Sequence, residues 1–432
     1  MSIFGALDTA ISGLTAQSAS FGNISDNIAN SQTTGFKRVD TNFLNYLTAS
    51  SATFNDPGSV VATPQYVNNV QGTITQSSNP LALAISGQGF FTVSSATASG
   101  SGGTTFAPQN LYTRDGNFQL NANGYLVNDN GNYLNGWSVA AGGQVNTNTL
   151  QPIQVSQAAY APVPTANVTL AANLPPAGSP STTTPGVQNP ITSNVTVYDA
   201  QGQSHQLTLA FTSAGANTNN WTVTVTDDAG NTIGSGTVAF GADGTLASVV
   251  QGGGTQSTPG QPATLTLNTV YPTPGGSTQN INLNLGTIGG TSGLTQFAGS
   301  SFTLGGVSQD GIAPGQFSSI SMQSDGNVVV NYDNGQSRTI AQVPVSTFAA
   351  PDALQSQNGA AFTATLDSGS PSTQAAGTNG AGTLVTSALE SSNVDIASEF
   401  SNLIVAQQAY SANAKTVTTA DQMLQATLNM IQ

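Results

Sequence analysis

Large apolar residues recur at alternating steps of four and three along the stretch 393–432. The residues on this ladder are Ile396, Phe400, Leu403, Tyr410, Val417, Leu424, Leu428 and Ile431, with Ala414 also in phase and Gln407 and Asp421 as polar interruptions. Such spacing places the side chains on one narrow stripe of an α-helix, as in a coiled coil. We therefore predict one long helix over this stretch.

The same alternation occurs at the other end of the chain, at Phe4, Leu7, Ile11, Leu14, Phe21 and Ile28. It predicts a helix that Ser2 can cap and that ends near Asn30. Each stripe alone is too narrow for stability in water, because helices in proteins are held mostly by burial of their apolar face. One alternative is that both helices pack inside a globular core. The second alternative is that the helices pair with each other and with neighbouring copies. It is favoured because the middle of the chain is β-rich and leaves little to cover both sides of a helix pair.

Between the helices, apolar and polar residues alternate in short runs, which is typical of half-buried antiparallel strands. Asp115-Gly116, Asn123-Gly124 and Asn130-Gly131 are hairpin signals within a first group of strands. A second group runs from Val195 to Leu285 among Pro-rich and Gly-rich stretches, and the first pattern resumes at Ile320. The order indicates that one β-domain is inserted into another.

The predicted fold is mainly β with α-helical, coiled-coil-forming termini, a discontinuous β-domain and a second β-domain inserted in it. The predicted ranges are 1–30 with 391–432 for a terminal helical assembly domain, 31–71 with 366–390 for an extended connector, 72–145 with 296–365 for the discontinuous β-domain, and 146–295 for the inserted outer β-domain. Gly369 to Gly382 is expected to be a flexible return linker.

The chain has few charged residues, and most of them are acidic. Charged residues make up 6% of the chain, and five basic residues face 19 acidic ones, for a net charge of −14. This balance argues against nucleic acid as a partner. Cysteine is absent, so there is no disulfide framework and no thiolate metal site.

Neither a membrane anchor nor a cleaved leader is expected. No segment has the roughly 20 apolar residues that a spanning helix requires. The first basic residue is Lys37, and no apolar core of signal-peptide length precedes it. Export, if it occurs, is expected to use another route than a cleaved signal peptide.

The residues of common catalytic and metal sites are missing or scattered. The single histidine, His205, lies on a strand-like segment and is interpreted as a solvated strand residue. Asp227-Asp228, Asp129-Asn130-Gly131 and Asp243-Gly244 lack the spacing of a calcium loop and are interpreted as turns. We predict no catalytic residue, no metal and no cofactor, and hence no enzyme.

Three segments, taken in order, resemble the bacterial flagellar rod and hook family. Ala29-Asn30-Ser31-Gln32-Thr33-Thr34-Gly35-Phe36-Lys37 is similar to its Ala-Asn-x-x-Thr-x-Gly-Phe-Lys signature, which here selects Ala29, Asn30, Thr33, Gly35, Phe36 and Lys37. Leu83 to Phe91 and Tyr112 to Phe118 resemble the next two blocks. An ordinary helix C-cap would also explain the first match. Helices commonly end at a glycine, and cations such as Lys37 and Arg38 are favoured just after a helix C-terminus.

Further segments resemble the hook proteins within that family, namely Asn194 to Trp221, Ser300 to Gly311 and Asn331 to Thr339. Ser392 to Asp395 and Gln407 to Lys415 resemble the terminal helix of the whole family. The resemblance covers nearly the whole chain. It implies a structural subunit that polymerises into a flexible curved tube outside the cell, transmitting torque from rod to filament. The implied partners are further copies, the distal rod protein, the hook cap, the hook-filament junction protein and the flagellar export apparatus.

Two alternatives stay open at this point. One is a distal rod or hook-filament junction protein, which is disfavoured because rod subunits are generally shorter and lack an inserted block. The other, from a different class, is a secreted β-rich adhesin.

Overall fold

The computed structural model describes residues 3–51, 54–100, 103–140, 142–176, 190–214, 219–271, 278–298 and 302–431. It forms two compact units. The first contains Met1–Gln157, Ser318–Asn331 and Ser337–Gln432, and the second contains Ala158–Phe317 and Tyr332–Gln336. The predicted insertion at 146–295 therefore differs from the observed second unit at both ends. The mainly β fold with helical termini is confirmed.

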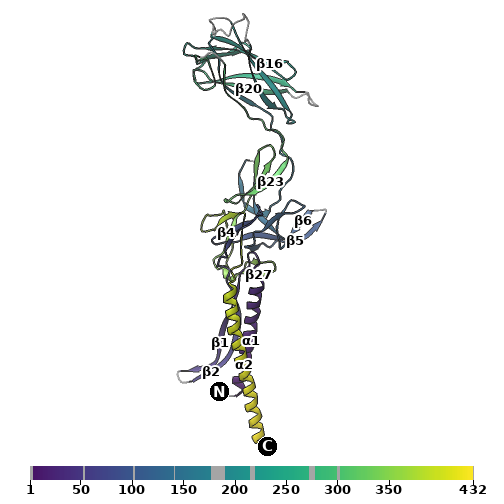
Figure 1. The fold of residues 1–432 in the computed structure, drawn as a ribbon, viewed down its shortest axis with the longest axis vertical. Coiled ribbons are helices and arrows are strands. Elements are labelled where there is room, and N and C mark those ends of the chain that lie inside the picture. The colour runs from purple at the N-terminus through teal and green to yellow at the C-terminus, as the bar shows by residue number, and fades with distance from the viewer. Residues whose placement is uncertain are drawn as a thin grey trace. The chain divides into compact units, whose positions relative to one another are not determined.

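The two terminal helices, α1 (Ile3–Ala29) and α2 (Ile396–Ile431), lie side by side in the first unit and run antiparallel (Figure 1). Phe21 of α1 meets Tyr410 of α2 edge to face, with ring centroids 6.2 Å apart. Asp395 caps α2, because its Oδ1 accepts the backbone N–H groups of Ala397 at 2.9 Å and Ser398 at 3.3 Å.

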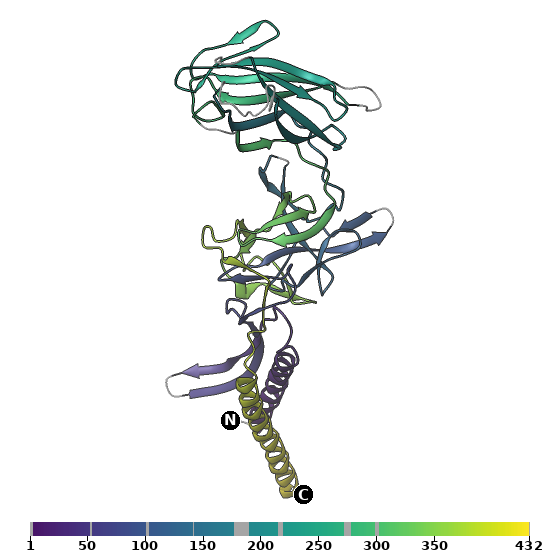
Figure 2. The same cartoon turned by 45° about the horizontal axis from the view of Figure 1, so that its top comes forward.

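The predicted connector 31–71 is wrong in its main part, because a long antiparallel hairpin occupies it. Strands β1 (Val39–Ser51) and β2 (Phe54–Tyr66) contact α1, and Figure 2 shows the hairpin at the side of the pair of terminal helices. The Thr9 hydroxyl donates to the Gly58 carbonyl at 2.8 Å, and the Ser12 hydroxyl accepts the Val60 N–H at 3.1 Å. Proline such as Pro64 is tolerated because both strands are edges.

The β-domain of the first unit is built mainly from one sheet. In the described residues its main path is β23 (Phe317–Met322), β24 (Asn327–Tyr332), β25 (Ser337–Gln342), β10 (Asn132–Val139), β5 (Phe91–Gly100), β7 (Leu111–Thr113), β28 (Ala361–Thr363) and β27 (Gln355–Gln357), and β11 (Val145–Pro152), β6 (Gly103–Phe106), β8 (Phe118–Leu120) and β9 (Leu126–Asn128) pair beside it. A buried hydrophobic cluster of this domain contains Phe90, Tyr112, Leu354 and Phe362.

Short pairs complete the first unit: β3 (Ile74–Gln76) with β31 (Ala388–Glu390), β4 (Leu83–Ser86) with β30 (Thr383–Thr386), and β26 (Val345–Thr347) with β29 (Ser372–Gln374), beside a 3₁₀ turn at Pro351–Ala353. The predicted return linker from Gly369 to Gly382 is therefore wrong as a free linker. It contributes β29, and its Gly382 N–H donates to the Gln88 carbonyl at 2.7 Å.

The second unit is a sandwich of two sheets. One is the meander β13 (Ile191–Tyr198), β14 (Ser204–Ser213), β15 (Asn220–Thr226), β16 (Thr232–Phe240), β17 (Leu246–Gln251) and β18 (Gly254–Gln256), and the other contains β19 (Pro262–Val270), β20 (Thr278–Thr287), β12 (Asn167–Asn173), β21 (Leu294–Thr295) and β22 (Thr303–Gln309). One core joins them, with Leu209, Val223 and Leu283 among its fully buried members. Alternation of inward apolar and outward polar residues produces this packing.

Candidate functional site

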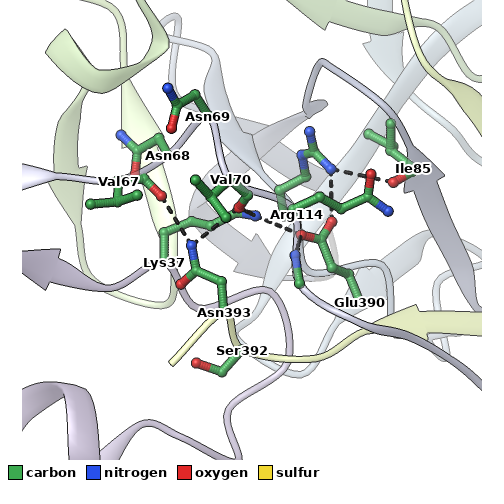
Figure 3. Close-up of polar contacts among 12 residues, drawn as sticks. Lys37, Val67, Asn68, Asn69, Val70, Ile85, Arg114, Glu390, Ser392 and Asn393 are labelled. Carbon is green, nitrogen blue, oxygen red and sulfur yellow. Dashed lines mark hydrogen bonds and ion pairs between the residues drawn. The ribbon is translucent and has the colours of Figure 1, made fainter. Parts of the chain in front are cut away.

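The three sequence segments that resemble one family meet the C-terminal segment in the first unit, where the helices join the β-domain. The Gly35 N–H donates to the Glu390 carbonyl at 2.8 Å, and the Leu83 N–H donates to the Gly116 carbonyl at 3.0 Å. Figure 3 shows the polar contacts around Glu390. We call this set of segments the junction.

A buried ion triad forms the centre of the junction. The Lys37 ammonium lies 2.5 Å from Oε1 of Glu390, and the Arg114 guanidinium lies 2.7 Å from Oε2 (Figure 3). The three side chains are 1%, 3% and 0% exposed for Lys37, Arg114 and Glu390 respectively. One carboxylate therefore pairs with two cations that are more than 70 positions apart in the chain, one on each of its oxygens.

Backbone groups give the triad further hydrogen bonds. Lys37 donates to the Val70 carbonyl at 2.7 Å, and Arg114 donates to the carbonyls of Ile85 at 3.3 Å and Gly87 at 2.7 Å. Burial lowers the pKa of the Lys37 ammonium, and the Glu390 carboxylate opposes that shift. Because each ion is desolvated, the cluster is stable only when all its members are present.

Asn393 ties the exit of α1 to the entry of α2. Its Nδ2 donates to the carbonyls of Val67 and Val70, each at 3.1 Å, and its Oδ1 accepts the Arg38 N–H at 2.8 Å. A second buried tie lies one turn further into the helices. There Asn27 exchanges two hydrogen bonds with the backbone of Val39, at 2.9 and 3.0 Å. Asn393 thus joins the segment before α2 to both ends of the β1–β2 hairpin, and Asn27 joins α1 to the start of β1.

The residues of the first family signature are distributed along the end of α1 and the start of the junction. Ala29 is exposed in the last turn of α1, while Asn30 bonds Asp26 at 2.8 Å and Thr33 bonds Asn30 at 3.1 Å. These contacts form a local turn. Phe36 is partly buried, whereas Lys37 belongs to the triad. Only the end of the signature therefore reaches distant parts of the chain.

Gly35 is required at its position for two reasons. Its φ is +69°, and a Cβ there would lie 2.4 Å from the Asp115 nitrogen. We expect Gly35→Ala to lower the free energy of unfolding by about 3 kcal/mol or more, combining a left-handed backbone cost of about 1–2 kcal/mol with a clash. Gly131→Ala is the matched control, because Gly131 has φ +79° and open space around it. Equal losses in denaturant unfolding would contradict the close contact at Gly35.

Asp115 is a buried carboxylate beside the triad. It is 2% exposed, and its oxygens accept the Asn117 N–H at 3.2 Å and the Asn130 side-chain amide at 3.0 Å. Burial raises the pKa of this carboxyl to about 6 from 3.8. The folded chain therefore binds the proton more tightly than the unfolded chain between these values, so this group's contribution to stability falls as pH rises from about 4 to 6.

Asp115→Asn removes that ionisation. We expect the variant to exceed the wild type in free energy of unfolding by about 1–3 kcal/mol at pH 7.5, and the gap to close at pH 4. Urea unfolding of both proteins across this range measures the gap. A gap that stays constant with pH would show that the Asp115 carboxyl is not the titrating group.

The predicted α1 stripe is only partly buried in this single copy. Leu7, Leu14, Phe21 and Ile28 are half-buried, and Ile11 is 48% exposed. The fully buried positions of α1 are instead the neighbouring, mostly small or polar ones, namely Ala10, Ala16, Ser20, Ile24 and Asn27. Small residues let α1 lie close to its neighbours, so the large ones are displaced to the sides.

The predicted α2 stripe divides in the same way. Leu403, Val417 and Leu424 are half-buried, whereas Ile396, Phe400, Tyr410 and Leu428 are 40–62% exposed. The side chain of Ile431 lies outside the described residues. Glu399, Ala406 and Ala420 are the buried positions of α2. Large apolar side chains of both helices are therefore left uncovered.

A groove of about 370 Å³ lies between α1, α2 and β1. Its apolar walls come from Ile24, Val39, Phe43, Val405 and Ala406, and its polar lining includes Asn27, Arg38, Asp40 and Glu399. Burial raises the pKa of the Glu399 carboxyl, and a hydrogen bond from the Asn27 side chain opposes the shift. Arg38 lies 3.3 Å from Asp40 at the side of this groove.

His205 is buried, so its interpretation as a solvated residue is wrong. It is 8% exposed, its ring stacks on Tyr271 at 3.9 Å, and its Nδ1 lies 3.1 Å from an Asp228 oxygen. It shares the inward phase of β14 with Leu207 and Leu209. In the described part of the chain, no group of three or more His, Cys, Asp or Glu side chains could hold a metal ion.

No helix in the described ranges has the length and hydropathy needed to cross a membrane.

Four family models match the chain in succession. They are the flagella basal body rod protein at residues 7–37, the flagellar hook protein FlgE/F/G D1 domain at 84–170, the flagellar basal body protein FlaE D2 domain at 167–312 and the flagellar basal body rod FlgEFG protein C-terminal region at 385–430.

Full-length relatives carry one name, flagellar hook protein FlgE. The protein from Rhizobium meliloti is 31% identical and that from Brucella abortus 32% identical, each with 100% of both chains covered. The Escherichia coli protein is 32% identical over 98% of this chain and all of its own. The crystal structure of Helicobacter pylori flagellar hook protein FlgE2 aligns with a TM-score of 0.47 and 15% identity, covering 73% of this chain and 100% of its own.

Proposed function

The chain belongs to the family of flagellar hook proteins, and we propose that its copies assemble into the hook through their two terminal helices. The protein is a structural subunit and not an enzyme. A distal rod or junction protein, or an adhesin, is not favoured, because the relatives that match from end to end are hook proteins.

The observation that carries the helical contact is the uncovered apolar surface of α1 and α2. Phe4, Ile11, Phe400, Ile404, Val405 and Leu428 are 48–66% exposed. Large exposed apolar side chains that gather on one pair of helices are typical of an interaction site. Neighbouring copies supply the missing cover; Phe4, Ile11, Phe400 and Leu428 belong to the predicted stripes, whereas Ile404 and Val405 lie beside them.

We further propose a division of labour between the two units. The helices and the hairpin β1–β2 hold copies together, and the sandwich of the second unit makes polar outer contacts that can slip as the tube bends. The outward positions of its six-stranded sheet support this role, since Thr196, Thr208, Thr222, Thr224 and Thr237 recur there and carry no charge.

Family membership also suggests the other partners. We propose that the assembled chain contacts the distal rod protein, the hook cap and the hook-filament junction protein, and that it leaves the cell through the flagellar export apparatus. The tube would then transmit torque from rod to filament.

Electron microscopy of the concentrated, purified chain tests the proposed function. We expect regular tubes that form above a critical concentration. The amount of tubes should increase with salt concentration, because copies with a net charge of −14 repel one another at low ionic strength. Dispersed monomers under all these conditions would contradict self-assembly.

A further inference from the structure

The groove between α1, α2 and β1 combines apolar walls with a polar lining that holds two carboxylates, Asp40 and Glu399, and one guanidinium, Arg38. Phe43 and Val405 line it and are 42% and 66% exposed, while the Glu399 carboxylate inside is 2% exposed overall. Arg38 also lines the groove and acts on Glu399 electrostatically, but its guanidinium pairs with Asp40. Among the described side chains no cation lies within ion-pair distance of Glu399, whose hydrogen-bond partner is the neutral Asn27.

A lysine side chain matches this lining. Its four-carbon stem covers apolar surface and its ammonium group is a compact donor of three hydrogen bonds, so the stem suits the walls and the ammonium suits Glu399. The groove volume of about 370 Å³ is enough for a side chain of this size.

The chain has one cation placed to fill this role. Of its five basic residues, Lys37, Arg114 and Arg38 are already in ion pairs. Among the described side chains, Arg338 and Lys415 have no such partner. Lys415 is the one on the terminal helices, where it is exposed.

Lys415 cannot enter the groove of its own copy. It lies sixteen residues after Glu399 on α2, which is about 24 Å along the helix at 1.5 Å per residue. Ala406 lines the groove and is nine residues before Lys415, which is about two and a half turns. The groove and Lys415 are therefore on opposite sides of α2.

We propose that the Lys415 side chain of one copy binds the groove of the next copy, with its ammonium on Glu399. This inference rests on the proposed self-assembly and names one of its contacts. Because donor and acceptor surfaces lie on opposite sides of one helix, the contact is heterologous. It therefore continues from copy to copy and does not close into a dimer.

Cross-linking tests the contact directly, because the natural chain has no cysteine. In polymers of the Lys415→Cys/Val405→Cys variant, mild oxidation is expected to give a ladder of disulfide-linked oligomers, since the two positions approach within bonding range only between copies. Arg338→Cys/Val405→Cys is the matched control and is expected to give no ladder. Polymers of the first variant that yield no more cross-links than the control would overturn the proposal.

Charge substitutions give a second readout. Lys415→Gln and Glu399→Gln are each expected to raise the critical concentration for polymerisation about tenfold, and the double variant no further, because both remove one interaction. Arg338→Gln is the control and should assemble like the wild type. Circular dichroism and unfolding of the monomers check that each variant folds. If the two substitutions have additive effects, or if Lys415→Gln has no effect, the pairing is contradicted and self-assembly is not. If the wild type fails to polymerise, both the proposed function and the contact are overturned.

Discussion

Replacing Glu390 by glutamine is expected to lower the free energy of unfolding of the first unit by about 3–5 kcal/mol. The side chain keeps its size but loses its charge, so Lys37 and Arg114 face each other without a counter-ion in a site where all three side chains are 3% exposed or less. Removing one member of a buried ion cluster costs far more than removing a surface pair, because the remaining charges cannot be solvated.

The two tryptophans make this measurement specific. Trp137 lies in the first unit and Trp221 in the second. In a Trp221→Phe background, fluorescence during urea unfolding reports the first unit, and in a Trp137→Phe background it reports the second. Glu390→Gln should shift the first transition alone, and Asp8→Asn, an exposed helix position, should shift neither. A loss under 1 kcal/mol in the first transition would show that the triad is not needed for stability.

The helices could be predicted from the sequence because their signal is local. A four-and-three spacing of large apolar residues indicates a helix, whether its apolar stripe is buried within one copy or between copies. The spacing therefore predicts α1 and α2 to within a few residues. It could not show which side would be covered within a single copy. That depends on Ala10, Ala16, Ala406 and Ala420, whose small size permits close packing and gives no hydrophobic signal.

The junction could be predicted only in part. Two cations stand out in a chain with five, and both Lys37 and Arg114 lie in segments that resemble one family. The sequence does not identify their counter-ion among 19 acidic residues, because Glu390 is brought to them by the pairing of β31 with β3. Long-range strand pairing of this kind leaves no local pattern.

The predictions for His205 and for the residues of the β1–β2 hairpin are wrong for different reasons. Residue type alone predicts a solvated histidine, although the position of His205 two residues before Leu207 places it on the inward face of β14. The hairpin has no clear strand signal in the sequence, because it carries prolines and polar residues, which a two-stranded ribbon accepts at its edges and a central strand does not.

We propose that the exposed apolar side of the terminal helices holds copies together, and polymerisation of a Phe400→Gln/Ile404→Gln variant tests this most directly. The two side chains are 50% and 53% exposed and one turn apart on α2, so the monomer should fold as before. Covering the exposed halves of both is worth about 1.5–3 kcal/mol per contact, so the critical concentration should rise about ten- to a hundredfold. Gln408→Ala, one turn further along, is the matched control and should assemble normally. Tubes that form from the double variant at the wild-type critical concentration would contradict the account.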